Sequence, residues 1–350
     1  RIYMNKIIAA FDNKKAFIIT YYNSYNYGAF LQAFALQEFL KSNNVDAFIW
    51  KFDSISAKVF GRVYSLLKPS KTTPEQLNYT RGKKESIISA QKYLNLRNRL
   101  EKSDLIILGS DEIWNVKNLG ASHDYFMFKK QKLAKKTISY AACAGNTGEE
   151  LLKKWPCAYK GIKSLDGVSV RDEKTLDIVK SFGRRDAVIL IDPTFLIDFT
   201  KYLPYISISQ PYLFVYSYGL KAEEILAIKK FAIENNLKTV ATGCYSPWAD
   251  ENPTPDPFEW VALVKNSELV ITSTFHGTAL SIQQNVRFAV LNRSSHKIES
   301  LLNRFQLLNR MLTSETSLDY LASHDIDYKT INDQVHFEQK KSHEFIMKFL

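Results

Sequence analysis

The chain has 350 residues, of which 45% are hydrophobic and 24% are charged. This is an ordinary globular composition, so wholesale disorder and collagen-like repeats are excluded. The length is about twice that of a typical domain of ~150 residues and predicts two compact domains. The 47 basic and 36 acidic residues give a net charge of +11. That charge favours acidic partners such as phosphorylated or carboxylated ligands, anionic lipids or nucleic acid.

Cysteine spacing and apolar runs limit the kinds of site that the chain can build. The three cysteines are far apart and show no CxxC pattern, which excludes a disulfide framework and a structural zinc site of the common spacings. A reducing, cytoplasmic compartment is the natural inference. No apolar run approaches the roughly 18 residues that a membrane-spanning helix needs. We therefore expect a cytoplasmic protein without a bound metal.

In the first half of the chain, apolar runs alternate with helical patterns, which is typical of a parallel α/β fold. Strands are predicted at 16–22, 45–52, 105–108, 137–142, 167–170 and 187–191. Helices are predicted at 29–41, 149–155 and 173–182, and an exposed basic helix at 81–102. The alternation predicts an N-terminal α/β domain over residues 1–200.

A second alternation follows the turn-rich stretch 198–210. Strands are predicted at 212–218, 238–242, 269–271 and 287–291. Helices are predicted at 222–235, 258–265, 277–284, 296–308 and 333–350. We expect a C-terminal α/β domain over 201–332 and a final helix at 333–350 that packs back on the N-terminal domain. The predicted fold is therefore α/β, with two Rossmann-like domains facing each other across a cleft that holds the ligand.

The most informative segment is TSTFHG at 272–277, where a strand runs into a helix that we expect to begin at Gly277. A helix N-terminus attracts anions through its unpaired N–H groups and its dipole, and Gly277 would let the backbone approach such a ligand. Thr274 and Thr278 can add hydroxyl donors. His276 suits proton transfer or a cationic contact with a phosphate. The alternative is a capping cluster with a histidine bonded to the backbone.

A similar loop at 26–32 enters a helix after a predicted strand. Asn26 can cap that helix, and Gly28 can open the backbone toward a ligand. The pattern GxGxxG is absent, so dinucleotide binding is not supported. The alternative is a plain helix cap.

Two more predicted strands are followed by side chains that could bind a ligand. Two carboxylates and a tryptophan follow the strand 105–108, and an arginine follows the strand 167–170. Asp111 and Glu112 could hold sugar hydroxyls through charge-assisted hydrogen bonds, and the indole of Trp114 could carry the apolar face of a sugar. The alternative is an ordinary turn. Arg171 could grip a carboxylate or phosphate bidentately, or else form a surface ion pair with a neighbouring carboxylate. Because all four clusters end predicted strands, we expect them to share one site.

Six segments, in this order along the chain, resemble the polysaccharide pyruvyl transferase family. They are 26–37 (NYGAFLQAFALQ), 109–115 (GSDEIWN), 138–145 (ISYAACAG), 168–173 (VSVRDE), 191–193 (IDP) and 272–281 (TSTFHGTALS). The resemblance implies a two-domain fold similar to GT-B glycosyltransferases. It also implies transfer of pyruvate from phosphoenolpyruvate onto a sugar of a bacterial surface or capsular polysaccharide precursor, as a cyclic ketal, with release of phosphate and no cofactor.

Site residues carry over from the resemblance by position. His276 corresponds to the family's phosphate-side histidine and would act as the acid or stabilise the phosphate, while Arg171 would pair with an anionic group of the donor. Asp111 or Glu112 would orient or deprotonate the acceptor hydroxyls. The remaining expected substrate contacts are Asn26, Tyr27, Gly28, Gln32, Ser110, Trp114, Ser273, Thr274, Phe275, Gly277, Thr278 and Arg293.

The chain departs from the family pattern at three positions: Glu112 replaces a common glutamine, Cys143 a common serine, and Thr274 an arginine found in some members. The last departure leaves Arg293 and Lys297 as candidate cations for the donor.

Other functions fit parts of the sequence. The nearest alternative is a GT-B-type glycosyltransferase that uses a nucleotide-sugar donor, and a non-catalytic sugar-binding protein is another. A nucleic-acid binder is suggested only by charge, and the scattered basic residues argue against it. If the acceptor is a lipid-linked oligosaccharide, the basic stretches 81–102 and 129–136 would hold the protein on the inner face of the membrane, at ~1 kcal/mol per basic residue near anionic lipid. The alternative is a solvated face.

Overall fold

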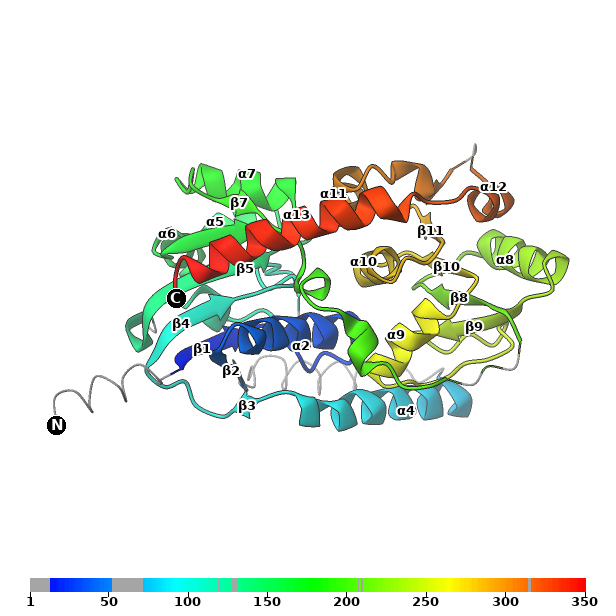
Figure 1. Ribbon diagram of the computed structural model, residues 1–350, viewed down its shortest axis with the longest axis horizontal. Coiled ribbons are helices and arrows are strands. Elements are labelled where there is room, and N and C mark those ends of the chain that lie inside the picture. Colours follow the sequence, from blue (N-terminus) through cyan, green and yellow to red (C-terminus); the bar gives the residue numbers. More distant parts are fainter. Residues whose placement is uncertain are drawn as a thin grey trace.

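The computed structural model describes residues 13–51, 72–118, 120–127, 131–206, 208, 210–313 and 316–350. Two parallel β-sheets, each with helices packed on its faces, form the two halves of the molecule (Figure 1). The predicted α/β class with parallel sheets is therefore confirmed. In the part of the chain that the structure describes, no helix is long and apolar enough to cross a bilayer.

The first sheet has seven strands in the order β3-β2-β1-β4-β5-β6-β7. Every neighbouring pair is parallel, so the carboxyl ends of the strands meet at one edge. The strands are β1 (Lys14–Ile19), β2 (Val45–Trp50), β3 (Leu96–Arg97), β4 (Ser103–Leu108), β5 (Ala134–Ala142), β6 (Gly167–Val170) and β7 (Val188–Ile189). The central strands are buried on both faces, which explains why they read as continuous apolar runs.

The second sheet has five parallel strands in the order β12-β11-β10-β8-β9. They are β8 (Tyr212–Tyr216), β9 (Lys238–Thr242), β10 (Leu269–Thr272), β11 (Phe288–Leu291) and β12 (Met311–Leu312). β10 lies at the centre, so the loop after it is held by strands on both sides.

Most of the helices that flank these sheets overlap a predicted range. The helices are α2 (Tyr27–Ser42), α4 (Pro74–Ala90), α5 (Glu149–Lys154), α6 (Ala158–Lys163), α7 (Glu173–Ser181), α8 (Ala222–Glu234), α9 (Pro257–Lys265), α10 (Phe275–Gln283), α11 (His296–Arg304), α12 (Leu318–Ser323) and α13 (Tyr328–Met347). The short elements α6, α12, β3 and β12 were not predicted, because a few residues show no clear periodicity.

One predicted helix is wrong in its bounds and its exposure. The basic stretch 81–102 is not one exposed helix: α4 ends at Ala90 and β3 follows. α4 begins at Pro74 because Thr73 and Gln76 form a capping box ahead of it. Lys83 on this helix is buried, although Arg81 and Lys84 are exposed.

Helix α2 joins the halves. It is almost entirely buried, and its aromatic residues meet α9 of the second half. Tyr27 stacks on Trp260 with ring centroids 5.5 Å apart, and Phe34 meets Phe258 edge-on at 4.9 Å. Such pairs add to the apolar burial and make one core cluster that includes residues of both sheets.

The C-terminal helix α13 runs across the upper part of Figure 1 from the second half to the first. Gln339 donates to the carbonyl of Phe195 at 2.5 Å, and His343 lies 2.9 Å from the side-chain oxygen of Asn43 at the end of α2. These hydrogen bonds show that α13 contacts the first half directly. The domain limits at residues 200 and 332 stay a prediction.

Candidate active site

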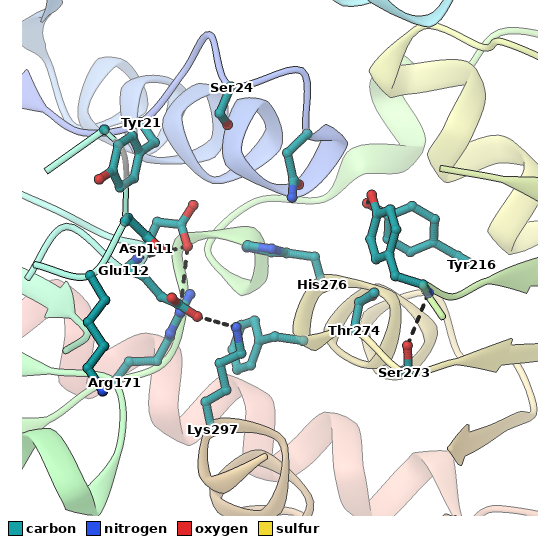
Figure 2. Close-up of a pocket in the computed structure, with 16 residues that line it drawn as sticks. Tyr21, Ser24, Asp111, Glu112, Arg171, Tyr216, Ser273, Thr274, His276 and Lys297 are labelled. Carbon is teal, nitrogen blue, oxygen red and sulfur yellow. Dashed lines mark hydrogen bonds and ion pairs between the residues drawn. The ribbon is translucent and has the colours of Figure 1, made fainter. Parts of the chain in front are cut away.

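A cavity of about 690 Å³ lies where the carboxyl ends of the strands of both sheets face each other (Figure 2). Its lining comes from the loops after β1, β4, β6, β8 and β10, from the last residue of β8, and from the first turns of α10 and α11. The lining residues are Tyr21, Ser24, Asn26, Asp111, Glu112, Lys117, Asn118, Gly120, Arg171, Tyr216, Tyr218, Ser273, Thr274, Phe275, His276 and Lys297. The four sequence clusters therefore do meet at one place.

A buried charge cluster forms the floor of this cavity. Arg171 has a side chain only 2% exposed, and it donates from Nη1 to Oδ2 of Asp192 at 2.9 Å. The alternative interpretation of Arg171, a surface ion pair with Asp172 or Glu173, is therefore wrong. Nε2 of His276 lies 3.7 Å from the same Asp192 oxygen. Burial would raise the pKa of Asp192, but His276 and Arg171 outweigh it and lower the pKa below its ordinary value.

The position of His276 depends on Gly28. Asn26 caps α2 as predicted, accepting hydrogen bonds from the N–H groups of Gly28 at 2.9 Å and Ala29 at 3.3 Å. A Cβ at position 28 would lie 2.1 Å from ring atoms of His276. The expectation that Gly28 opens toward a ligand is therefore wrong, because the imidazole fills that space.

Helix α10 begins two residues earlier than predicted, at Phe275, because Thr274 is its N-cap. Thr274 Oγ1 accepts from the N–H of Gly277 at 3.0 Å, and Thr278 Oγ1 donates to the Thr274 carbonyl at 2.9 Å. A Cβ on Gly277 would lie 2.2 Å from Oγ1 of Thr272. Gly277 and Thr278 thus serve capping and close packing, and the expected ligand contacts from them are wrong. The cap leaves the first N–H groups of the helix without intrahelical acceptors.

The acidic pair after β4 has two different environments. Glu112 forms an ion pair with Lys297 of α11 and accepts from Asn115 Nδ2 at 2.7 Å. Burial alone would raise the pKa of Glu112, but Lys297 overcomes it and lowers the pKa to about 2. Asp111 Oδ1 lies 3.6 Å from Arg171 Nη2 and faces the cavity. Lys297, one of the two candidate cations, is therefore held at the cavity by Glu112 (Figure 2).

Several expected substrate contacts lie behind the cavity wall. Trp114 is fully buried, donates from Nε1 to the Tyr125 carbonyl at 3.1 Å and stacks on Phe126, so it offers no platform for a sugar. Ser110 is also buried and donates to the Ala141 carbonyl at 3.0 Å and to Asp192 at 3.1 Å. Ser110 therefore contacts the floor through Asp192, and neither of the two side chains lines the cavity.

Three more expected contacts have partners elsewhere. Gln32 is buried and donates to the Tyr21 carbonyl at 2.8 Å, while Tyr27 packs in the core between the halves. Arg293 donates from two nitrogens to both carboxylate oxygens of Glu224, at 2.7 and 2.6 Å, and lines a different cavity. Of the two candidate cations for the donor, Lys297 therefore lines the candidate active site, whereas Arg293 does not.

Cys143, one of the three expected departures from the family pattern, is buried, and its thiol donates to Asp172 Oδ2 at 3.0 Å. Burial raises the pKa of this thiol to about 12, so it stays protonated and acts in packing. Asp172 in turn accepts from the N–H and hydroxyl of Thr175, capping α7.

The sequence pattern alone did not single out part of the cavity lining, nor Asp192, the buried partner of Arg171. The cavity residues that it missed are Tyr21, Ser24, Lys117, Asn118, Gly120, Tyr216 and Tyr218. All follow or end a strand, so their position at the carboxyl edge of a sheet was the available signal. Asp192 had a signal too, since the segment IDP was among the six that carry the resemblance. Among the described residues, no three His, Cys, Asp or Glu side chains gather as metal ligands.

Solved structures with the same architecture show the fold. A UDP-N-acetylglucosamine 2-epimerase is 11% identical over 97% of this chain and 95% of its own, with a TM-score of 0.55. A putative UDP-N-acetylglucosamine 2-epimerase from Listeria monocytogenes is 10% identical, covers 94% and 91%, and has a TM-score of 0.50. The S. aureus MnaA–UDP complex is 12% identical, with the same coverage and TM-score. At such identities the likeness establishes the GT-B-type fold of two Rossmann-like halves and nothing about activity.

No curated protein sequence matches this chain significantly. The sequence profile of one family, polysaccharide pyruvyl transferase, matches residues 26–295. This range includes the loops after β4, β6 and β10, together with His276, Arg171, Asp111 and Asp192. The chain therefore belongs to the polysaccharide pyruvyl transferase family and is a transferase.

Proposed function

We propose that this protein transfers the pyruvyl group of phosphoenolpyruvate to two hydroxyls of one sugar in a bacterial surface or capsular polysaccharide precursor, as a cyclic ketal, and releases phosphate. One observation carries the proposal. In a chain of this family, Arg171, His276 and Lys297 meet Asp111 at a single cavity between the two sheets.

The donor has a carboxylate and a phosphate, and the cavity offers a matching set of groups. Arg171 is fixed through Nη1 by Asp192, and its Nε and Nη2 make no hydrogen bond with any described residue. The guanidinium can therefore take a carboxylate or phosphate oxygen. Lys297 and the first N–H groups of α10 supply further positive charge for the remaining anion.

The reaction needs a proton at carbon 3 of the donor, and we assign its delivery to His276, which lines the cavity. Protonation makes carbon 2 electrophilic, the first sugar hydroxyl attacks it, and the C–O bond to phosphate then breaks. The second hydroxyl closes the ketal. One hydroxyl proton restores His276 and the other leaves with the phosphate, so the step balances. In the alternative role, His276 stabilises the phosphate as it leaves.

The two carboxylates cannot share one role. Glu112, with its pKa lowered to about 2, is a weak base that holds Lys297 in place. We assign the contact with the acceptor hydroxyls to Asp111, whose side chain faces the cavity beside Arg171.

The proposal extends to where the protein works. We propose a cytoplasmic enzyme that takes a lipid-linked oligosaccharide as acceptor and touches anionic lipid on the inner face of the membrane. Arg81 and Lys84 on α4 are exposed and suit this contact. In the second basic stretch, 129–136, Lys135 pairs with Asp104 and Lys136 pairs with Asp166. Residues 129 and 130 of this stretch lie outside the described part of the chain. The stretch 129–136 therefore supports contact with the membrane less than α4 does.

One assay tests the proposed function. The protein is incubated with phosphoenolpyruvate and acceptors that contain galactose, glucose or mannosamine, and phosphate release and product mass are followed together. We expect acceptor-dependent phosphate release and a product heavier by pyruvate less one water. A parallel incubation replaces phosphoenolpyruvate with a UDP-sugar. If phosphoenolpyruvate stays intact in the first incubation while the UDP-sugar is consumed in the second, the glycosyltransferase alternative holds instead, as the GT-B-type fold would allow.

A further inference from the structure

A second cavity, of about 390 Å³, lies between α4 and the loop after β9. Its described lining contains two lysines, Lys83 and Lys84, and three tyrosines, Tyr25, Tyr79 and Tyr245, but no carboxylate. Tyr79 fixes the two walls together, because its hydroxyl accepts from the N–H of Gly243 at 2.9 Å. The cavity is therefore cationic, aromatic and built by contacts between the two halves.

Lys83 is the unusual residue of this cavity. It is only 9% exposed, and its Nζ donates to the Gly243 carbonyl at 2.8 Å. The rings of Tyr27 and Tyr218 lie 5.3 and 5.9 Å from this nitrogen. The ammonium has three N–H donors, and it forms no ion pair with any described carboxylate. Burial lowers the pKa of Lys83 to about 8, which reflects the cost of an unpaired charge away from water.

This second cavity adjoins the candidate active site. Ser24 and Asn26 line the first cavity, whereas Tyr25 between them lines the second. Tyr25 has a positive φ of 50°, a conformation that is rare for a bulky residue. Tyr218 lines the first cavity, and its ring lies against Lys83. A sugar in the first cavity is thus separated from Lys83 by one tyrosine side chain.

We propose that the second cavity binds a phosphoryl group, as a phosphate or diphosphate ester carried by the acceptor sugar. Lys83 is the main cation, exposed Lys84 adds a second, and the tyrosine rings pack against the sugar to which the phosphoryl group is attached. The volume suits a sugar phosphate. The assignment of the phosphoryl group to the acceptor rests on the proposed ketal transfer. The binding of an anion in the second cavity does not depend on that transfer.

The binding test uses the full chain and inorganic pyrophosphate, titrated by calorimetry in the presence of saturating phosphoenolpyruvate. We expect Lys83→Met to weaken pyrophosphate binding about 10-fold or more, because a charge-assisted hydrogen bond is lost. The matched control is Arg81→Met, which removes one exposed positive charge from the same helix and should change the affinity less than about twofold. Equal affinity in Lys83→Met and wild type would overturn the proposal, as would pyrophosphate binding that phosphoenolpyruvate abolishes.

Two additions make the result specific. Because Lys83→Met removes a buried unpaired charge, its melting temperature should equal or exceed that of wild type, so weaker binding cannot be attributed to unfolding. Tyr25→Ala should weaken binding of glucose 1-phosphate but leave pyrophosphate binding unchanged.

Titration with UDP and with glucose 1-phosphate separates the sources of the anion. Lys83-dependent binding of the sugar phosphate supports the acceptor assignment, and Lys83-dependent binding of UDP alone overturns it. If phosphoenolpyruvate is never consumed, the proposed function fails. The proposed anion site is still decided separately, by whether Lys83→Met weakens pyrophosphate binding.

Discussion

His276 is held by two residues that lie far from it in the sequence and by the start of its own helix. Its ring packs against Gly28, its Nε2 faces Asp192 at 3.7 Å, and it follows the N-cap of α10. A side chain fixed on several sides can present a proton in one direction, which is what protonation at a carbon atom requires.

Replacing His276 with glutamine removes the proton donor and keeps a polar side chain of similar size. We expect kcat for ketal formation to fall by ~10²-fold or more. The control is His336→Gln, the same substitution at an exposed position on α13, which should leave kcat unchanged. Near-normal turnover by His276→Gln would rule out the acid role.

The ion pair of Glu112 and Lys297 makes stability depend on pH in a defined window. The pKa of Glu112 falls from 4.5 to about 2 in the fold, so the folded protein favours the ionised carboxylate. This contribution is complete above pH 4.5 and is lost as the pH falls toward 2. Glu112→Gln should therefore unfold more easily at pH 7 by about 2 kcal/mol, allowing for solvent at the 29% exposed lysine.

The measurement is the free energy of denaturant unfolding as a function of pH. The difference between wild type and Glu112→Gln should shrink below pH 4.5 and vanish near pH 2. Glu85→Gln, at an exposed position on α4, serves as the control and should show little difference at any pH. A difference for Glu112→Gln that stays constant down to low pH would contradict the ion-pair explanation.

At the scale of elements, the N-terminus of α2 meets the first turn of α10. This contact requires a glycine at position 28, because a Cβ there would lie 2.1 Å from the His276 ring. Helix packing of this kind cannot relax locally, since both helices are fixed by the sheets beneath them.

Gly28→Ala tests this contact. The added methyl must displace the imidazole, so we expect kcat to drop by about 10-fold or more and the free energy of unfolding to fall by about 1–3 kcal/mol. Gly148→Ala is a matched control, since nothing lies within 4 Å of a Cβ at that position. A wild-type kcat in Gly28→Ala would contradict this prediction, because it would show that the imidazole of His276 can be displaced without loss of catalysis.

At the scale of the whole molecule, the two halves are joined on several sides. Aromatic packing of α2 on α9 forms the base, α13 crosses above, and the pair of Glu112 and Lys297 joins the loop after β4 to α11. The cavity is therefore shaped by the relative placement of two sheets rather than by either one.

The exposed cations of α4 provide a test at this scale. Sedimentation with liposomes should increase with the anionic lipid fraction and decrease with salt. The double variant Arg81→Met, Lys84→Met should bind less than Lys229→Met, Lys230→Met, which removes the same charge from exposed positions on α8. Sedimentation that ignores salt and lipid charge would contradict membrane contact through α4.

The sequence by itself determined the parallel α/β class, most strands and helices, and the loops that end them. Buried parallel strands appear as apolar runs, and capping residues such as Asn26 and Thr274 act within a few positions, so both can be recognised locally. Because ligands bind at the carboxyl ends of parallel strands, His276, Arg171 and Asp111 could be placed at one site before any contact was known.

Only the tertiary structure decided which of these groups meet and what each one contacts. The contact of Gly28 with His276, the pairing of Asp192 with Arg171, and the choice of Lys297 over Arg293 all depend on how two sheets pack. Buried Lys83 lies on a helix whose local pattern suggested full exposure. Periodicity records which face of an element is covered, but the partner that covers it comes from distant parts of the chain.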